Sequence, residues 1–216
     1  MSMTLAETIA REFGTPAVAI DLDIVERNIA RLQQRCDEAR VANRPHIKTH
    51  KSPILAQMQR EAGAAGITCQ KLGEAEVMVE AGFDEILISY NILGDEKVRR
   101  LAALMAKAHM VVCADNPTTV AHVAEAGRIA GQPLDVLVEC DTGRKRAGVE
   151  TAAEAIALAR DIAARPELRF AGLLLYPLPE GMAETQRFFE QVCEGVREAG
   201  VEQPRIVSSG GTPNVA

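Results

Sequence analysis

The sequence lacks long runs of one charge, and its 30 acidic and 24 basic side chains give a net charge of −6. This balance argues against a nucleic acid or an anionic membrane surface as the main partner. The sequence also lacks any apolar stretch near the roughly 20 residues that span a bilayer. Its N-terminus has no basic start followed by an apolar block, so it does not resemble a secretory signal. We expect no nucleic acid and no membrane among the partners.

Cysteine is too sparse and too scattered for a disulfide framework. There are five, an odd number without a CxxC pair, at positions 36, 69, 113, 140 and 193. A zinc site built from these residues is not expected. Free, buried thiols in a reducing compartment are the simplest interpretation, and we therefore expect a cytoplasmic protein.

What the sequence does contain is a regular alternation of two patterns. Hydrophobic residues make up 47% of the 216 positions and charged residues 25%, as in a globular domain. Short runs rich in valine, isoleucine and leucine alternate with amphipathic stretches of helical spacing. The predicted strands span residues 17–22, 44–48, 66–70, 85–89, 109–114, 134–140, 169–176 and 204–209.

Strands that alternate with helices predict an α/β fold with a parallel sheet. Open doubly wound sheets and closed barrels both fit. No GxGxxG motif follows an early strand, and the regular spacing favours a (β/α)8 TIM-type barrel. If residues 17–22 precede the barrel, seven strands remain, and the chain stops where the eighth should follow. We therefore expect an N-terminal segment at 1–22 and, at 23–216, a barrel of about seven units, truncated before its last strand.

The stretch RPHIK at residues 44–48 is the first candidate for chemistry. In a strand, Arg44, His46 and Lys48 would share one face. A lysine at the carboxyl end of an inward-facing row projects into the barrel mouth, where partial desolvation makes its amine a nucleophile. Solvated loop lysines are an equally good interpretation of this stretch alone. Lys51 lies after the strand and is the weaker candidate.

A second cluster, SSGGTPN at residues 208–214, follows the last predicted strand. Gly210 and Gly211 allow the backbone to approach an anion closely, and Ser209 and Thr212 add hydroxyl donors. In such barrels the loops after strands seven and eight often bind phosphate. A simple glycine-rich turn is the alternative, and the strand count favours the phosphate site.

Three further features follow or end other strands. The stretch ECDTGRKRAGV at residues 139–149 crowds Arg146 with two other cations, where they can hold a phenolate or a carboxylate. Gln70 can offer an amide to a ligand, and Tyr176, one of only two tyrosines, can face a planar ring. One rim thus offers partners for the aldehyde, phosphate, phenolate and ring of pyridoxal phosphate.

Four blocks in this order, RPHIKTHKS, GITCQKLGEAEVM, ECDTGRKRAGV and SSGGTPN, resemble the D-threonine aldolase and D-serine dehydratase family. These are pyridoxal phosphate enzymes whose barrel is like the N-terminal part of alanine racemase. The resemblance implies a lyase acting on D-β-hydroxy amino acids, by retro-aldol cleavage or by elimination. It implies that Lys48 is the catalytic residue and bonds to the cofactor. It also implies that the cofactor contacts Gln70, Arg146, Tyr176, Ser209, Gly210, Gly211 and Thr212.

The family pattern also implies a second, β-rich domain downstream, which residues 17–22 would join as a strand. That domain would supply a divalent metal, zinc or manganese, and no metal ligand can be assigned within this chain. GLLLYPLPEG at residues 172–181 lacks the histidine expected after the tyrosine of the better-known aldolases. The sequence therefore does not choose between aldolase and dehydratase, nor between a homodimer and a monomer.

Three other functions fit parts of the pattern. They are a non-catalytic pyridoxal phosphate carrier, an amino-acid racemase, and a barrel that binds another phosphorylated metabolite. The chain length favours the carrier, whereas the set of motifs favours the lyase. Because an unclosed barrel leaves two sheet edges unpaired, we expect this chain alone to be poorly active.

Overall fold

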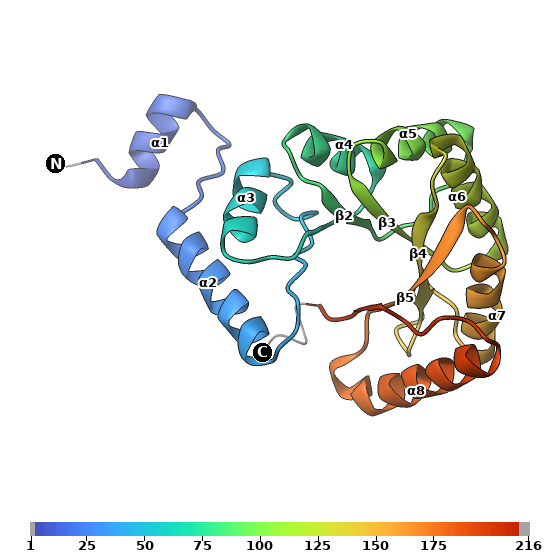
Figure 1. Ribbon diagram of the computed structural model, residues 1–216. Helices are drawn as coiled ribbons and strands as arrows, with labels where there is room; N and C mark the ends of the chain where they lie inside the picture. The colour runs from blue at the N-terminus through green and yellow to red at the C-terminus, as the bar shows by residue number, and fades with distance from the viewer. Residues whose placement is uncertain (1–2, 212–216) are drawn as a thin grey trace.

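Six parallel strands form a curved sheet at the centre of the protein (Figure 1). The computed structural model describes residues 3–211. Strands that follow one another in the chain are neighbours in the sheet, as in a (β/α)8 barrel, and the sheet curls into a half-barrel. The strands are β1 (Ile67–Cys69), β2 (Glu85–Ile88), β3 (His109–Ala114), β4 (Leu134–Cys140), β5 (Leu168–Leu175) and β6 (Ile206–Ser208).

Helices connect successive strands and cover the outer face of the sheet (Figure 1). A short 3-10 turn precedes the last of them. The connecting helices are α4 (Leu72–Glu80), α5 (Asp95–Met105), α6 (Pro117–Ala130), α7 (Ala152–Ala163) and α8 (Met182–Glu198). Three helices precede the sheet, α1 (Leu5–Phe13), α2 (Leu22–Glu38) and α3 (Pro53–Glu61). The alternation predicted from the sequence is confirmed for these five connections.

The ends of α6 show how local residues set helix boundaries. The side chain of Asn116 accepts the N–H of Thr119 at 2.9 Å, and Pro117 occupies the first turn. Gly131 ends the helix with a φ of +67°, which glycine adopts without a Cβ clash. Both boundaries of α6 therefore follow from the residues at its ends.

Both faces of the sheet are buried along most of β1 to β5, which explains why these strands are nearly continuous apolar runs. Toward the helices, Ile86 and Val112 are fully buried in the main core. A second, smaller cluster fills the interior of the half-barrel. It consists of Leu87, Val111, Leu137 and Ala171. Alternate residues of one strand therefore serve two cores, as the pleat requires.

A cluster of charged side chains lies at the amino ends of the strands, and we call it the Asp135 cluster. Asp135, only 2% exposed, accepts from Arg169 Nε at 2.7 Å, from His109 Nε2 at 3.1 Å and from Arg205 Nη2 at 3.3 Å. The other ring nitrogen of His109 lies 2.9 Å from a carboxylate oxygen of Glu85. These five residues belong to β2, β3, β4, β5 and the approach to β6, so one network ties five strands together.

The prediction of a strand at residues 44–48 is wrong, because the structure has a single bridge there. Only His46 pairs with β1, and the next four residues form a turn. Pro45 has no N–H to donate to a strand ladder, and the N–H of Lys51 bonds to the carbonyl of Ile47 at 2.8 Å, which bends the chain away. Within residues 3–211, the barrel part therefore has six strands, and the bridge at His46 takes the place of the first of the seven predicted strands.

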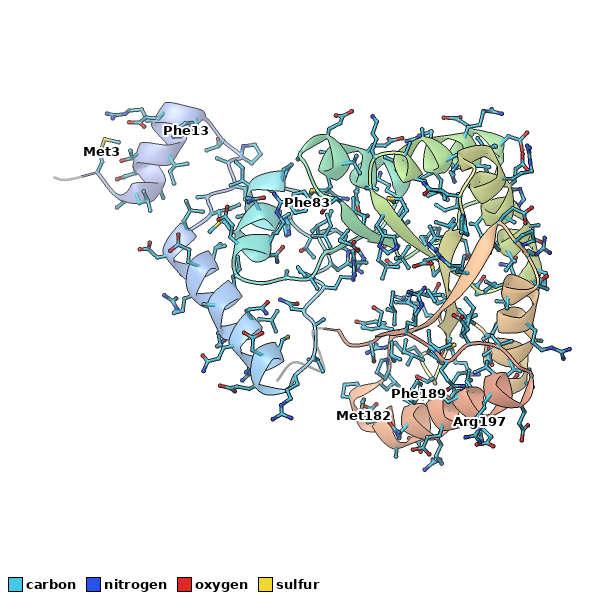
Figure 2. All side chains as sticks on the ribbon, in the orientation of Figure 1. Met3, Phe13, Phe83, Met182, Phe189 and Arg197 are labelled. Carbon is cyan, nitrogen blue, oxygen red and sulfur yellow. The ribbon has the colours of Figure 1, made fainter. Side chains whose placement is uncertain are left out.

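The strand predicted at residues 17–22 is also absent from the described residues. The chain there pairs with no other strand, and Leu22 already begins α2. Val18 is 93% exposed, and Figure 2 shows Phe13 on a helix that stands away from the sheet. A strand needs a neighbour for its backbone hydrogen bonds, and this segment has none among residues 3–211. Its pairing with a second domain stays a prediction.

The cysteines are free thiols, as the sequence predicted, but Cys36 and Cys193 are only partly buried. Cys69, Cys113 and Cys140 are buried. Burial raises the pKa of Cys69 to about 12, so this thiol stays protonated at neutral pH. In the part of the chain that the structure describes, no helix is both long enough and apolar enough to cross a membrane.

Candidate active site

The carboxyl ends of parallel strands meet at one edge of the sheet, and the predicted site residues lie along it. Gln70 follows β1, Tyr176 follows β5 and Ser209 follows β6. Arg146 lies in the loop after β4, and Lys48 in the turn after the His46 bridge. The topology alone thus brings residues from five separate parts of the sequence to one rim.

The turn that contains Lys48 is anchored on both faces of the sheet. Ile47 is fully buried in the main core, whereas His46 faces the other way and its Nε2 lies 3.2 Å from Ser89 Oγ. The backbone N–H of Lys48 donates to His46 Nδ1 at 3.3 Å. Burial and then the Lys48 ammonium lower the pKa of His46, so its ring is neutral, with Nδ1 the acceptor. The alternation predicted for residues 46 and 47 is confirmed, although the strand is not.

The two lysines of this turn have different surroundings. The Lys51 ammonium forms an ion pair with Glu74, whose side chain is only 7% exposed. The Lys48 side chain is exposed and forms no ion pair with another residue between 3 and 211. The structure therefore leaves Lys48 as the unpaired amine of the turn, whereas the sequence ranked Lys51 lower only because of its position after the predicted strand.

The loop after β4 is built around Asp141, a buried carboxylate. Asp141 accepts the backbone N–H of Gly143 at 2.8 Å and that of Arg146 at 2.6 Å. Burial raises the pKa of Asp141, but the hydrogen bonds from these backbone amides lower it by a larger amount. The pKa is therefore below its ordinary value. The loop then returns to pair with β4 at Val149. It is thus a closed, hydrogen-bonded unit rather than a solvated charge run.

Tyr176 is where three loops meet. The guanidinium carbon of Arg144 lies 3.8 Å from the centre of its ring and that of Arg146 lies 5.0 Å from it, both within cation–π range. Arg144 also donates to the carbonyls of Tyr176 at 2.7 Å and Pro177 at 2.8 Å. A Cβ on Gly211 would come within 2.0 Å of the ring, so the chain after β6 lies directly against it.

Sequence reasoning placed Arg146 and Tyr176 correctly at one mouth but assigned no separate role to Arg144. The structure shows that Arg144 is the arginine that binds the loop after β5. Ser89, the partner of His46, was not singled out. A polar residue ending the apolar run EILIS was the only signal for it.

A buried carboxylate lies below this loop, inside the half-barrel. Glu139 of β4 is 8% exposed, accepts the thiol of Cys113 at 3.5 Å and lies 3.9 Å from an Nη atom of Arg146. Burial raises the pKa of Glu139, and the nearby carboxylate of Asp115 raises it further. The mouth therefore has an acid that binds protons more readily than an exposed glutamate.

Comparison with known proteins identifies the fold and its relatives. The sequence pattern described as "Alanine racemase, N-terminal domain" matches residues 20–216. The chain belongs to this family. It is 40% identical over 185 residues to a D-threonine aldolase from Arthrobacter sp., a match that covers 86% of this chain and 48% of that protein.

Two further comparisons of this alanine racemase-type chain match enzymes with related names. It is 36% identical over 211 residues to a D-threo-3-hydroxyaspartate dehydratase from Delftia sp. (strain HT23), covering 92% of the chain and 55% of the relative. The crystal structure of D-threonine aldolase from Filomicrobium marinum superposes with a TM-score of 0.87 at 36% identity, over 93% of this chain and 58% of that one. The chain spans about half the length of the curated relatives it matches.

The glycine-rich end of this alanine racemase-type domain is only partly described. Ser209 is exposed, and a Cβ on Gly210 would meet no atom within 4 Å, so open space adjoins the turn. Thr212 lies outside the described residues. Within residues 3–211, no three His, Cys, Asp or Glu side chains gather as metal ligands.

Proposed function

We propose that this chain is the cofactor-binding barrel of a lyase that acts on D-β-hydroxy amino acids, with pyridoxal phosphate as its cofactor. The main support is that the free amine of Lys48 lies at the same sheet edge as the contact among Arg146, Tyr176 and Gly211. Relatives at 40% and 36% identity are named D-threonine aldolase and D-threo-3-hydroxyaspartate dehydratase, and both names describe such substrates.

The donor set fits this cofactor. Lys48 would bond to its aldehyde, Arg146 would donate to its phenolate oxygen, and Tyr176 would lie against its ring. The phosphate would be held by the glycine-rich turn, where open space adjoins Gly210, at Ser209, Gly210, Gly211 and Thr212. When bound, the cofactor supplies an electron sink for negative charge at the amino acid Cα.

The chain's own residues would orient the substrate and move protons. In an elimination, the Lys48 amine would take the proton from Cα. Gln70, half-buried beside His46, would line the pocket on the Lys48 side. Arg144 would keep the Tyr176 ring in place through its carbonyl contacts. Retro-aldol cleavage needs a base for the β-hydroxyl, which we expect from outside the described residues together with the metal.

The remaining expectations belong to the whole protein. We infer that residues 1–22 join a downstream β-rich domain, that residues 23–216 form the barrel part, and that the downstream domain holds zinc or manganese. The exposed apolar side chains of the N-terminal segment support such a partner. We further infer a cytoplasmic protein that assembles as a homodimer.

An absorbance spectrum with and without borohydride tests the proposal. Added pyridoxal phosphate should give an imine band, and borohydride followed by peptide mapping should place the label on Lys48. The whole protein, with the downstream domain and its metal, should then convert D-threonine to glycine and an aldehyde, or D-threo-3-hydroxyaspartate to an oxo acid and ammonia. An L-amino acid as sole product would indicate a racemase. The absence of any labelled lysine would refute cofactor binding.

A further inference from the structure

Two primary amines share the turn at the carboxyl edge of the sheet. Lys48 and Lys51 are three positions apart, and the N–H of Lys51 closes the turn on the carbonyl of Ile47 at 2.8 Å. An aldehyde held at this mouth would therefore meet two side chains of the same chemistry. A contact that makes one of the two amines less available would decide where the cofactor is attached.

Glu74 binds one of the two amines. One of its carboxylate oxygens pairs with the Lys51 ammonium, and the other accepts the backbone N–H of Gln70 at 2.7 Å. Burial raises the pKa of Glu74, but the contacts with Lys51 and Gln70 together lower it by a larger amount. The carboxylate is therefore charged. Among the described residues, Lys51 forms the only ion pair of this buried carboxylate. Removing it would leave a buried charge unpaired.

The backbone of Lys51 is also held in an uncommon conformation. Its φ is +50°, and only two other non-glycine residues in the described part of the chain have a positive φ. Such a conformation persists only where surrounding contacts impose it. Here the contacts are the buried Ile47 on one side, Ser52 capping α3 on the other, and the ion pair with Glu74.

We propose that Glu74 is a positioning residue that withholds Lys51 and thereby directs an aldehyde at this mouth to Lys48. The inference rests on the proposed function and deepens it, because it names what selects the attachment site. Glu74 acts through Lys51 and makes no contact with the reacting atoms.

The chemistry explains the selection. A lysine attacks an aldehyde with its nitrogen lone pair, so the ammonium must first release a proton; the C=N bond then forms and the aldehyde oxygen leaves as water. Lys48 has no ion pair to break among the described residues. Lys51 would first have to leave Glu74 and strand the buried carboxylate. Borohydride afterwards delivers a hydride to the carbon of the C=N bond while water protonates the nitrogen, which makes the attachment permanent and mappable.

Peptide mapping after pyridoxal phosphate and borohydride treatment tests this inference. The wild-type protein should be labelled at Lys48. In Glu74→Gln, which keeps the side-chain size and an acceptor for the Gln70 N–H, we expect the ratio of Lys51 to Lys48 label to rise roughly tenfold, because a buried charged partner is lost. Glu74→Asp, which keeps the charge, should restore much of the wild-type ratio.

A matched control lies on the same helix. Glu76 of α4 pairs with Arg100 at 2.7 Å and forms no ion pair with either lysine in the described part of the chain. Glu76→Gln therefore removes a carboxylate of the same helix, 34% exposed against 7% for Glu74, together with one ion pair, and it should leave the labelling ratio unchanged. A shift in this control as large as that of Glu74→Gln would overturn the inference.

The inference and the proposed function can fail separately. If no lysine is labelled in the wild-type protein, the proposed function fails. If Lys48 is labelled and Glu74→Gln keeps the wild-type ratio, only the inference fails. Should Glu74→Gln not fold, acetic anhydride labelling of the wild-type protein gives the answer. Lys48 should be acetylated faster than Lys51, and equal rates would overturn the role of Glu74.

Discussion

The two ends of the half-barrel use charge in opposite ways. At the amino ends, Asp135 is surrounded by Arg169, Arg205 and His109, and each charge has a partner within the protein. At the carboxyl ends, the Lys48 ammonium has no ion-pair partner in the described part of the chain. Glu139 there binds protons more readily than usual. The charged groups at the amino ends are paired with one another within the fold. The carboxyl ends keep the Lys48 ammonium available for a ligand.

This difference shows what each end contributes. A buried carboxylate with several hydrogen-bonded cations favours one folded arrangement and offers little to a ligand. An amine without a partner contributes little to folding and can bind a carbonyl compound. We therefore expect substitution of the unpaired Lys48 at the carboxyl ends to change cofactor binding but not stability, and substitutions in the Asp135 cluster at the amino ends to do the reverse.

Lys48→Ala should have the largest effect and is the strongest test of the carboxyl ends. It should abolish the borohydride-stable label completely, because it removes the amine that bonds to the aldehyde. The melting temperature should stay within about 1 °C of wild type, since exposed side chains contribute little to stability. Lys51→Ala serves as the matched control and should retain the label. Label retained in Lys48→Ala would contradict the assignment.

Asp135→Asn is the corresponding test of the amino ends. Removing one partner of a fully buried ion pair costs about 3–5 kcal/mol, but these cations are half exposed, so we expect about 2 kcal/mol. Urea unfolding followed by circular dichroism measures this. The affinity for pyridoxal phosphate in the folded protein should not change. A tenfold loss of affinity at unchanged stability would remove the distinction between the two ends.

Gly211→Ala is a second test of the carboxyl ends, with a smaller expected effect on the affinity for pyridoxal phosphate. A Cβ at 2.0 Å from the Tyr176 ring forces either the ring or the turn to move, and both contact the proposed cofactor site. We expect about a tenfold weaker affinity for pyridoxal phosphate, or roughly 1.4 kcal/mol. Fluorescence or absorbance titration measures it. Gly210→Ala is the sterically open comparison, although its φ of +123° adds backbone strain.

The smallest effect should be a pH dependence of stability at the amino ends. Burial lowers the pKa of His109, but its hydrogen bonds to Glu85 and Asp135 raise it above its ordinary value. The stabilisation is therefore complete below the unfolded-state pKa, about 6.5, and is lost as pH rises through the higher folded-state pKa. We expect about 0.5 kcal/mol between pH 6 and pH 9, because the ring is partly exposed. His109→Gln should remove this component of the pH profile.

Local patterns in the sequence predicted most of the fold but not the segment that holds Lys48. The strands at 109–114 and 134–140 were predicted with the bounds that the structure shows, since each is a long apolar run between clear punctuation. The stretch at 44–48 also alternates in polarity. It forms a turn because Pro45 lacks a donor and Lys51 bonds back to Ile47, and neither effect alters the polarity pattern.

The sequence by itself determined the alternation and order of the strand–helix units and the rim on which the candidate residues lie, although it predicted one barrel strand too many. These depend on neighbours within a few positions and on the handedness of parallel connections. Only the tertiary structure decided which lysine is paired and which charges neutralise one another. Lys51 meets a carboxylate 23 positions away and Asp135 meets Arg205 across 70 positions, and no local pattern encodes such contacts. Charge pairing is decided by distance in space, which exists only once the sheet has curled.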